Sequence, residues 1–267
     1  MRLHFIVACV SVACVIAVAT PATAQDRPFL FSISTVTPED KPNVRFDYDV
    51  GVGERAFQSD DSTQPEQRIG LQASFGRLTF LGRVGLAEVG NSYQSNQSGE
   101  VLLSMLGSAS AVALAAGAGV MLEAGGVNVL LARVVAGHDA PSWRLHGNVL
   151  FQKPMSTERD AVDLITSVGW AHKVSQSVSL GVEAIGEDLE GFWEAEEAEG
   201  GARLLAGPSL HISPGEHRWQ FIATGGPLFH PSDTGRASGA FRDLPPETRR
   251  TSYAFKMSLS IALVADR

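Results

Sequence analysis

The fold is decided by the stretch YAFKMSLSIAL at residues 253–263, where large apolar side chains alternate with small or polar ones. The large apolar side chains take every odd position, and Ala254, Lys256, Ser258 and Ser260 lie between them. A period of two places successive side chains on opposite faces of an extended chain. The stretch therefore predicts a β-strand with one apolar face and one polar face.

The same alternation recurs along the chain. It is clear at 43–51, 68–75, 78–86 and 143–152, and weaker at 100–106, 111–123, 127–136, 162–172, 178–186, 202–212 and 218–225. Together with 253–263, these segments predict about 12 strands. Their usual length of roughly 10 residues suits a tilted strand that crosses a bilayer, which takes about 9–11 residues.

The predicted connections alternate in length. Long connections fall at 52–67, 87–99, 153–161, 187–201 and 226–250, and short ones at 76–77, 107–110, 124–126, 137–142, 173–177 and 213–217. Only the short connection at 124–126 breaks the alternation. This is typical of an up-and-down barrel with brief turns at one rim and extended loops at the other.

Charged residues on the polar faces decide which face points inward. An Arg that faces lipid at the bilayer midplane costs about 2–4 kcal/mol, and hydrocarbon cannot satisfy the open edge of a sheet. We therefore predict an all-β fold, a closed antiparallel up-and-down transmembrane β-barrel over 43–267. The candidate lumen-lining residues are Arg45, Asp47, Asp49, Arg68, Arg83, Arg144, His146, Asp163, Glu183, Arg203 and Lys256.

Aromatic residues fall near the ends of the predicted strands, as in the interfacial girdles of membrane barrels. These residues are Trp143, Trp170, Trp219, Tyr253 and Phe29 or Phe31.

The first 24 residues read as a secretory signal peptide. Arg2 precedes an apolar run at 5–19, and an A-x-A site predicts cleavage between Ala24 and Gln25. The apolar run is too short for a membrane-spanning helix, which takes about 20 residues. Residues 25–42 then form an N-terminal segment ahead of the barrel.

Composition excludes several classes of protein. The chain has 267 residues with 44% hydrophobic and 19% charged side chains, which is too apolar for a disordered chain. The formal charge is 21 − 29 = −8, so a nucleic-acid partner is not expected. Both cysteines, Cys9 and Cys14, lie in the signal peptide, which excludes disulfides, thiol catalysis and cysteine metal sites from the remainder.

The signal peptide, alternating strands and asymmetric loops resemble those of a Gram-negative outer-membrane β-barrel. The segments 181–186 (GVEAIG) and 200–210 (GGARLLAGPSL) are similar to transporter-like barrels related to the outer-membrane proteins of phenol-degradation pathways. The resemblance implies residence in the outer membrane, contact with its lipid and lipopolysaccharide, and insertion by the barrel assembly machinery as a monomer. Members usually end on an aromatic residue, whereas this chain ends VADR, so either the internal strand 253–263 carries the insertion signal or assembly is unusual.

Three functions remain open at this stage. The charged interior predicts a passive conduit that selects a small solute, of unknown identity, by charge and size. Paired charges would instead fill a narrow lumen in a structural or binding barrel. The third alternative is a soluble periplasmic β-protein.

The sequence predicts neither an enzyme nor a cofactor or metal. His230, Ser232 and Asp233 share a Pro/Gly-rich loop that cannot orient a triad, and His146 has no obvious Ser partner. The acidic loop at 187–199 lacks the spacing of a calcium loop, so we interpret it as a solvated surface segment.

Overall fold

The computed structural model describes residues 43–53, 66–89, 92–106, 112–123, 126–155, 162–187, 189, 203–214, 219–229 and 251–265. The predicted signal peptide with its Ala24/Gln25 cleavage site, the segment 25–42 and the loop that holds His230 lie outside these residues. So does the acidic loop beyond Glu187, apart from Leu189.

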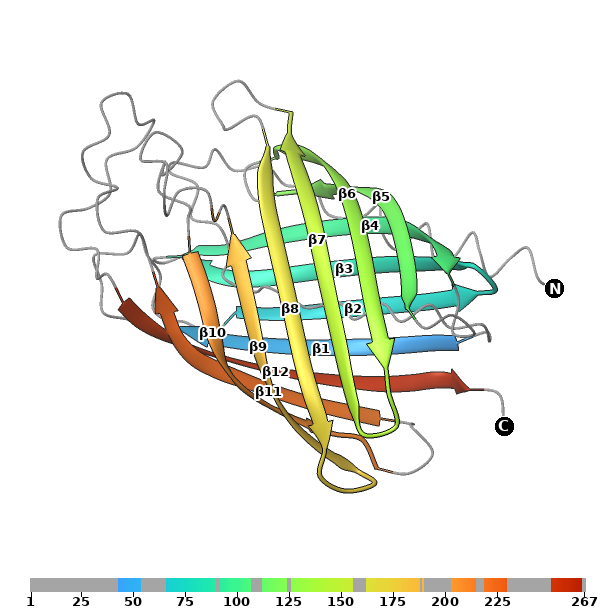
Figure 1. The fold of residues 1–267 in the computed structure, drawn as a ribbon. Helices are drawn as coiled ribbons and strands as arrows, with labels where there is room; N and C mark the ends of the chain where they lie inside the picture. The colour runs from blue at the N-terminus through green and yellow to red at the C-terminus, as the bar shows by residue number, and fades with distance from the viewer. Residues whose placement is uncertain are drawn as a thin grey trace.

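The described residues form twelve antiparallel strands that close into one barrel (Figure 1). Each strand pairs with its neighbours in sequence, and β1 pairs with β12 to complete the circuit. The predicted fold class is confirmed. None of the described segments is a helix able to cross a membrane. The strands are β1 (Asn43–Gly53), β2 (Glu66–Phe75), β3 (Leu78–Val89), β4 (Ser92–Leu106), β5 (Ala113–Leu122), β6 (Asn128–Asp139), β7 (Trp143–Pro154), β8 (Asp163–Lys173), β9 (Val178–Glu187), β10 (Arg203–Ile212), β11 (Trp219–Phe229) and β12 (Thr251–Ala265).

The two rims of the barrel differ. At one rim lie the short connections after β2, β4, β6, β8 and β10, together with the paired ends of β1 and β12 at Asn43 and Ala265. The turn between β2 and β3 consists of Gly76 and Arg77, and Gly76 has a φ of 59°, which favours glycine. The other rim carries the longer connections after β1, β7, β9 and β11, as the alternation of loop lengths predicted, together with the short connections after β3 and β5. We call these ends the turn rim and the loop rim.

One predicted loop is wrong. The segment 87–99 was expected to be a long connection, but β3 continues to Val89 and β4 begins at Ser92. The polar run from Gln94 to Ser98 pairs with β3 through the backbone. β4 has 15 residues, more than the roughly 9–11 that cross a bilayer. Its first residues therefore lie at the loop rim, where outward side chains need not be apolar.

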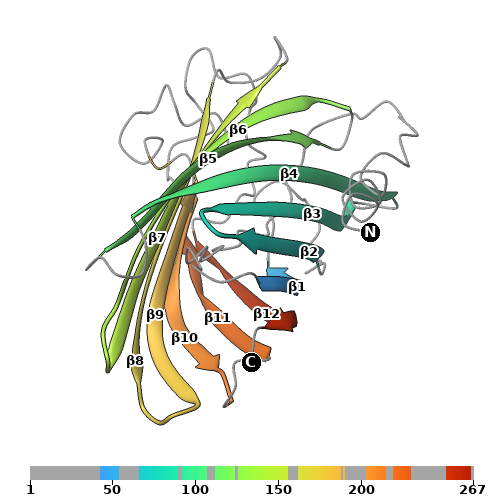
Figure 2. The same ribbon diagram turned by 90° about the vertical axis from the view of Figure 1, so that its right-hand side faces the viewer.

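The outer surface is an apolar belt. On β2 and β3 the outward positions Ile69, Leu71, Phe80 and Val84 are 40–49% exposed. The same alternation gives an exposed Phe255 on β12 between the buried side chains of Ala254 and Lys256. Figures 1 and 2 show these strands strongly inclined to those on the opposite wall, as expected for tilted strands in a barrel.

The interior is not uniformly polar, which differs from the expected pattern. Three groups of buried apolar side chains lie on the inward faces of the strands. Between Val129 and Val135, β6 is apolar on both faces except at Arg133, so the apolar/polar alternation alone did not assign its inward and outward positions. The groups are Leu81, Leu102, Ala115 and Val135; Val129, Leu131 and Leu150; and Ile185, Leu205, Leu228 and Ala254.

The ladder between β10 and β11 is interrupted near its middle. Pairing runs to Leu205 and Leu228, then resumes at Ser209 and Thr224. The interruption contains Pro208 and Pro227, and proline has no N–H to donate to a ladder. The strands stay adjacent because Gly225 and Gly226 let the backbones approach closely.

Three tryptophans mark the turn rim. Trp143 begins β7, Trp170 lies across from Leu145, and Trp219 begins β11. Trp170 and Trp219 are both exposed, and so is Tyr253 near the loop rim. Phe29 and Phe31 lie outside the described residues. The described aromatic residues are therefore placed as an interfacial girdle would be.

A charged side chain on the outward face of β3 should lower the free energy of unfolding most when it lies at the middle of the strand. We expect Val84→Arg to lower the free energy of unfolding in lipid vesicles by about 2–4 kcal/mol, and Leu78→Arg, on the same face at the turn rim, by about 0–1 kcal/mol. Denaturant titration followed by gel mobility measures both. Equal costs would contradict a lipid-facing outer belt.

Candidate functional site

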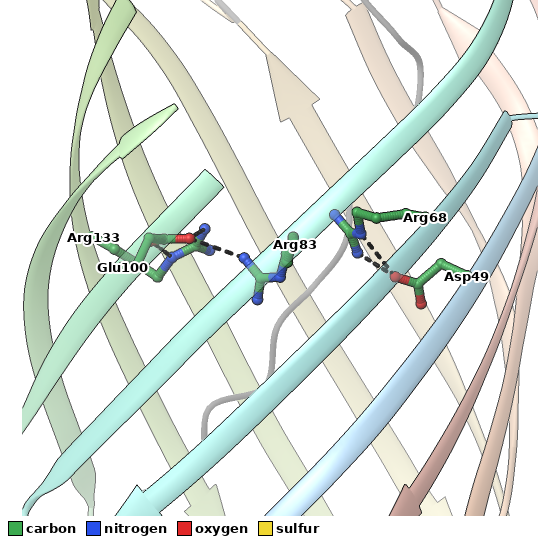
Figure 3. Close-up of polar contacts among 5 residues, drawn as sticks. All are labelled: Asp49, Arg68, Arg83, Glu100 and Arg133. Atoms are coloured by element: carbon green, nitrogen blue, oxygen red, sulfur yellow. Dashed lines mark hydrogen bonds and ion pairs between the residues drawn. The ribbon is translucent and has the colours of Figure 1, made fainter. Parts of the chain in front are cut away.

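Asp49 and Arg68 form a salt bridge on the inward face of the wall. They lie directly opposite each other on β1 and β2. Arg68 Nε donates to Asp49 Oδ2 at 2.9 Å, and Arg68 Nη2 donates to the same oxygen. Asp49 is buried, so the pair is held away from bulk solvent. Figure 3 shows it beside a second group that is centred on Glu100.

Glu100 on β4 is bonded by two arginines. Arg83 on β3 donates from Nη1 to Oε1 at 2.9 Å. Arg133 on β6 donates from Nε to Oε2 at 2.7 Å and from Nη2 to Oε1 at 2.8 Å. The last two bonds form the bidentate pairing in which guanidinium and carboxylate match best. The Glu100 side chain is 1% exposed.

Strand β5 lies between Glu100 and Arg133 and offers no side chain in their way. Gly119 is opposite Glu100, and Gly117 is opposite Arg133. A methyl group at Gly119 would lie 2.7 Å from Cγ of Glu100. The small residues of β5 therefore make room for a salt bridge that spans three strands.

Glu183 on β9 is the centre of a second group of contacts. Thr224 Oγ1 donates to Glu183 Oε2 at 2.8 Å, and His211 Nε2 lies 3.3 Å from Oε1. Lys256 lies opposite Thr224 and interacts electrostatically with the carboxylates of both Glu183 and Asp49. It therefore links the two groups, and charged side chains line the wall from β9 through β12 and β1 to β4 and β6.

Arg45 and Asp47 lie on β1 closer to the turn rim and bond to β11 and β12. Arg45 Nη2 donates to Gln220 Oε1 at 3.5 Å, and Asp47 accepts from the Ser260 hydroxyl.

Four further candidates are separate from these groups. Asp163 is buried at the loop-rim end of β8. Arg144 and His146 share Asp139 at the turn rim, with Arg144 Nε 3.9 Å and His146 Nε2 3.1 Å from Oδ1, and Asp139 is half exposed. Arg203 begins β10 opposite Glu187, and its side chain lies outside the described part of the structure. Whether any of the candidates lines a path for solute stays a prediction.

Sequence reasoning missed Glu100, Arg133, Thr224 and His211 as members of these groups. Arg133 is the one charged residue between apolar neighbours in the stretch 129–135, and Glu100 precedes the apolar run at 101–103. A charge in the middle of an apolar strand must avoid lipid, and this signal could have placed both of them inward.

The described residues form no hydrolytic triad. Ser209 Oγ lies 3.1 Å from His211 Nε2, the same nitrogen that faces Glu183. A triad needs one imidazole nitrogen for the hydroxyl and the other for the acid, but His211 Nδ1 is buried without a partner. Among the described residues, no three His, Cys, Asp or Glu side chains gather as metal ligands do.

Comparisons with known proteins bear on the fold. No family model and no curated protein matches the chain. The KdgM porin has a TM-score of 0.55 at 7% identity, with 82% of this chain and 99% of that chain covered. The NanC porin has a TM-score of 0.53 at 7% identity (81% and 98%), and an outer membrane channel from Pseudomonas putida F1 has a TM-score of 0.55 at 8% identity (88% and 100%). The chain has the fold of an outer-membrane β-barrel.

Loss of the Glu100 carboxylate should destabilise this barrel strongly. Glu100→Gln leaves two buried guanidinium groups without their anion, and breaking a buried pair costs about 3–5 kcal/mol. Asp139→Asn, which breaks a half-exposed contact, should cost about 0–1 kcal/mol. Unfolding in vesicles compares the two variants. A Glu100→Gln barrel as stable as the parent would contradict the role given to this salt bridge.

Proposed function

We propose that this protein is a passive channel for a small solute in the bacterial outer membrane, with paired charges along its interior wall. The observation that carries the proposal is the set of inward charged groups inside a closed barrel with an apolar exterior: the salt bridges Asp49–Arg68 and Arg83–Glu100–Arg133, together with Glu183 and Lys256. A filled core needs no charge at membrane depth, whereas charged rings in pores select solutes.

The arrangement of the pairs supports selection by charge and by size. Arg68, Arg83 and Arg133 lie on one arc of the wall, and each is bonded to a carboxylate that holds the guanidinium in place. Fixed opposite charges create a field across the lumen. A solute that crosses it is oriented by its own charge or dipole.

The same proposal includes how the protein resides and assembles in the membrane. The apolar belt and the rim tryptophans support a monomer in contact with outer-membrane lipid and lipopolysaccharide, inserted by the barrel assembly machinery. The similar structures, two porins and an outer membrane channel, support a channel rather than an enzyme.

A finer assignment rests on β9 and β10. The segments 181–186 and 200–210, which resemble transporter-like barrels of phenol-degradation pathways, fall largely on these paired strands. We extend the proposal to that family. This extension is tested by the uptake of labelled phenol at low concentration by cells with and without the protein. Identical uptake rates would contradict the extension.

A filled barrel is the second candidate. The three inward apolar groups and the burial of Glu100, Arg133 and Asp163 favour it, because water-filled walls usually expose such side chains. In that case the salt bridges hold the wall rigid and nothing passes.

Single-channel recording in planar bilayers decides between these functions. The parent should give discrete steps in KCl. Asp49→Asn removes the anion of Arg68 and should shift selectivity towards chloride, whereas Lys256→Met should shift it towards potassium. Asp139→Asn, at the turn rim, is the matched control and should change little. A folded protein without conductance would support the filled barrel and contradict the channel.

A further inference from the structure

A row of imidazole and indole side chains crosses the outer face of the barrel at the turn rim. His138 lies near the end of β6, Trp143 begins β7, and Trp170 and His172 lie near the end of β8. These three strands are neighbours in the barrel, and their turn-rim ends lie at the lower end of the wall in Figure 1. We call these four side chains the rim patch.

The rings of the rim patch alternate between imidazole and indole. The ring centroids of His138 and Trp143 lie 4.8 Å apart, and those of Trp170 and His172 lie 6.3 Å apart with an angle of 22° between the ring planes. Trp143 and His172 are directly opposite each other on β7 and β8, which joins the two pairs into one row. An indole face attracts a cation, so each imidazole lies beside a ring that favours its protonated form.

The rim patch faces the lipid and is accessible to it. Trp170 and His172 are both exposed and flank Ala171, whose side chain is buried on the inward face of the same strand. His138 and Trp143 are partly exposed. In outer-membrane barrels the short turns face the periplasm, and tryptophans lie at the level of the headgroups. The patch therefore lies at the depth of the phospholipid headgroups.

The charged groups next to the rim patch carry an excess of positive charge. Asp139, Arg144 and Lys173 are the charged residues that adjoin the patch along the described strands. The Asp139 carboxylate contacts Arg144 at 3.9 Å and the inward-facing His146 at 3.1 Å. Lys173 is exposed at the end of β8. One carboxylate therefore stands against two permanent cations before either imidazole of the patch is protonated.

The strands packed against the rim patch add no further charge to its outward side. His138 lies opposite Leu145 on β7, and His172 lies opposite Leu180 on β9. On the other side of β6, strand β5 begins at Ala113. Among the described residues of this outward face, only the two imidazoles change their charge between about pH 5.5 and pH 8.

We propose that the rim patch binds the headgroup phosphate of an anionic phospholipid, with its imidazole and indole N–H groups as donors, in preference to a zwitterionic lipid. Phosphate is the anion at this depth of the bilayer, and the excess of positive charge around the patch complements it. Protonation adds a positive charge to each imidazole, so the preference rises as the pH falls. The inference concerns the outer surface and does not depend on whether the lumen conducts.

The test measures which lipid contacts the rim patch. A Trp193→Phe/Trp219→Phe background keeps Trp143 and Trp170 as the only tryptophans of the chain. This protein is folded into vesicles of equal parts phosphatidylglycerol and phosphatidylcholine, in which one lipid or the other has brominated acyl chains. Bromine quenches indole fluorescence on contact, so the ratio of quenching by the two brominated lipids gives their relative affinity for the patch.

Two variants in this background assign the preference to the imidazoles. His138→Gln/His172→Gln removes both rings of the patch and keeps a polar side chain at each position. His146→Gln is the matched control, because it removes a histidine at the same rim that is buried on the inward face. Gel mobility before and after heating checks that each protein is folded.

We expect phosphatidylglycerol to be preferred about 5-fold at pH 5.5, the effect of one positive charge near the bilayer surface, and less than about 2-fold at pH 8. His146→Gln should keep this pH dependence, and His138→Gln/His172→Gln should lose it. Equal affinity for the two lipids at pH 5.5, or a preference that does not change with pH, would overturn the proposal in the background protein itself. A pH-dependent preference that survives in the folded double histidine variant would overturn it as well.

Discussion

Closure of the sheet is the constraint on which the rest of the structure depends. Hydrocarbon offers no partner to a backbone N–H or C=O, so a sheet in a membrane cannot keep a free edge. Here β1 pairs with β12 from the Asn43/Ala265 end to the Gly53/Ala254 end, and the ladder has no terminal strand. The irregular site at Val44 and Arg45 lies at the turn rim, where water can reach the backbone. The break between β10 and β11 at Pro208 is the exception inside the wall.

Once the sheet is closed, each strand has one face towards lipid and one towards the interior, and the charges have only one place to go. Asp49, Arg68, Arg83, Glu100 and Arg133 are all on the inward face, where desolvation makes an unpaired charge costly. The pairs therefore stabilise the wall and set its field at the same time. β5 contributes the space: its glycines keep the region between Glu100 and Arg133 clear of side chains.

The sequence predicts the fold well because a two-residue period survives wherever one face is apolar and the other is polar, as at 68–75 and 253–263. It fails where that contrast vanishes. Residues 94–98 of β4 are polar on both faces, and β6 is apolar on both faces except at Arg133, because Leu131 and Val135 pack inward. The sequence also could not predict which charged side chains contact one another in the site. Strand parity places Arg83 and Glu183 inward, but which side chains meet depends on register, and the bond from Arg133 across β5 depends on two glycines opposite it.

The most direct test of this account is to measure whether a single labelled residue faces the lipid or the interior of the barrel. Residues 25–267 contain no cysteine, so one cysteine at Ile69 and another at Gln72 can each carry a fluorescent probe without interference. In vesicles whose acyl chains bear a quencher, we expect strong quenching of the probe at Ile69 and little at Gln72, which lies on the inward face of the same strand. Equal quenching at both positions, or stronger quenching at Gln72, would contradict a barrel with its apolar face in lipid and its charges inside.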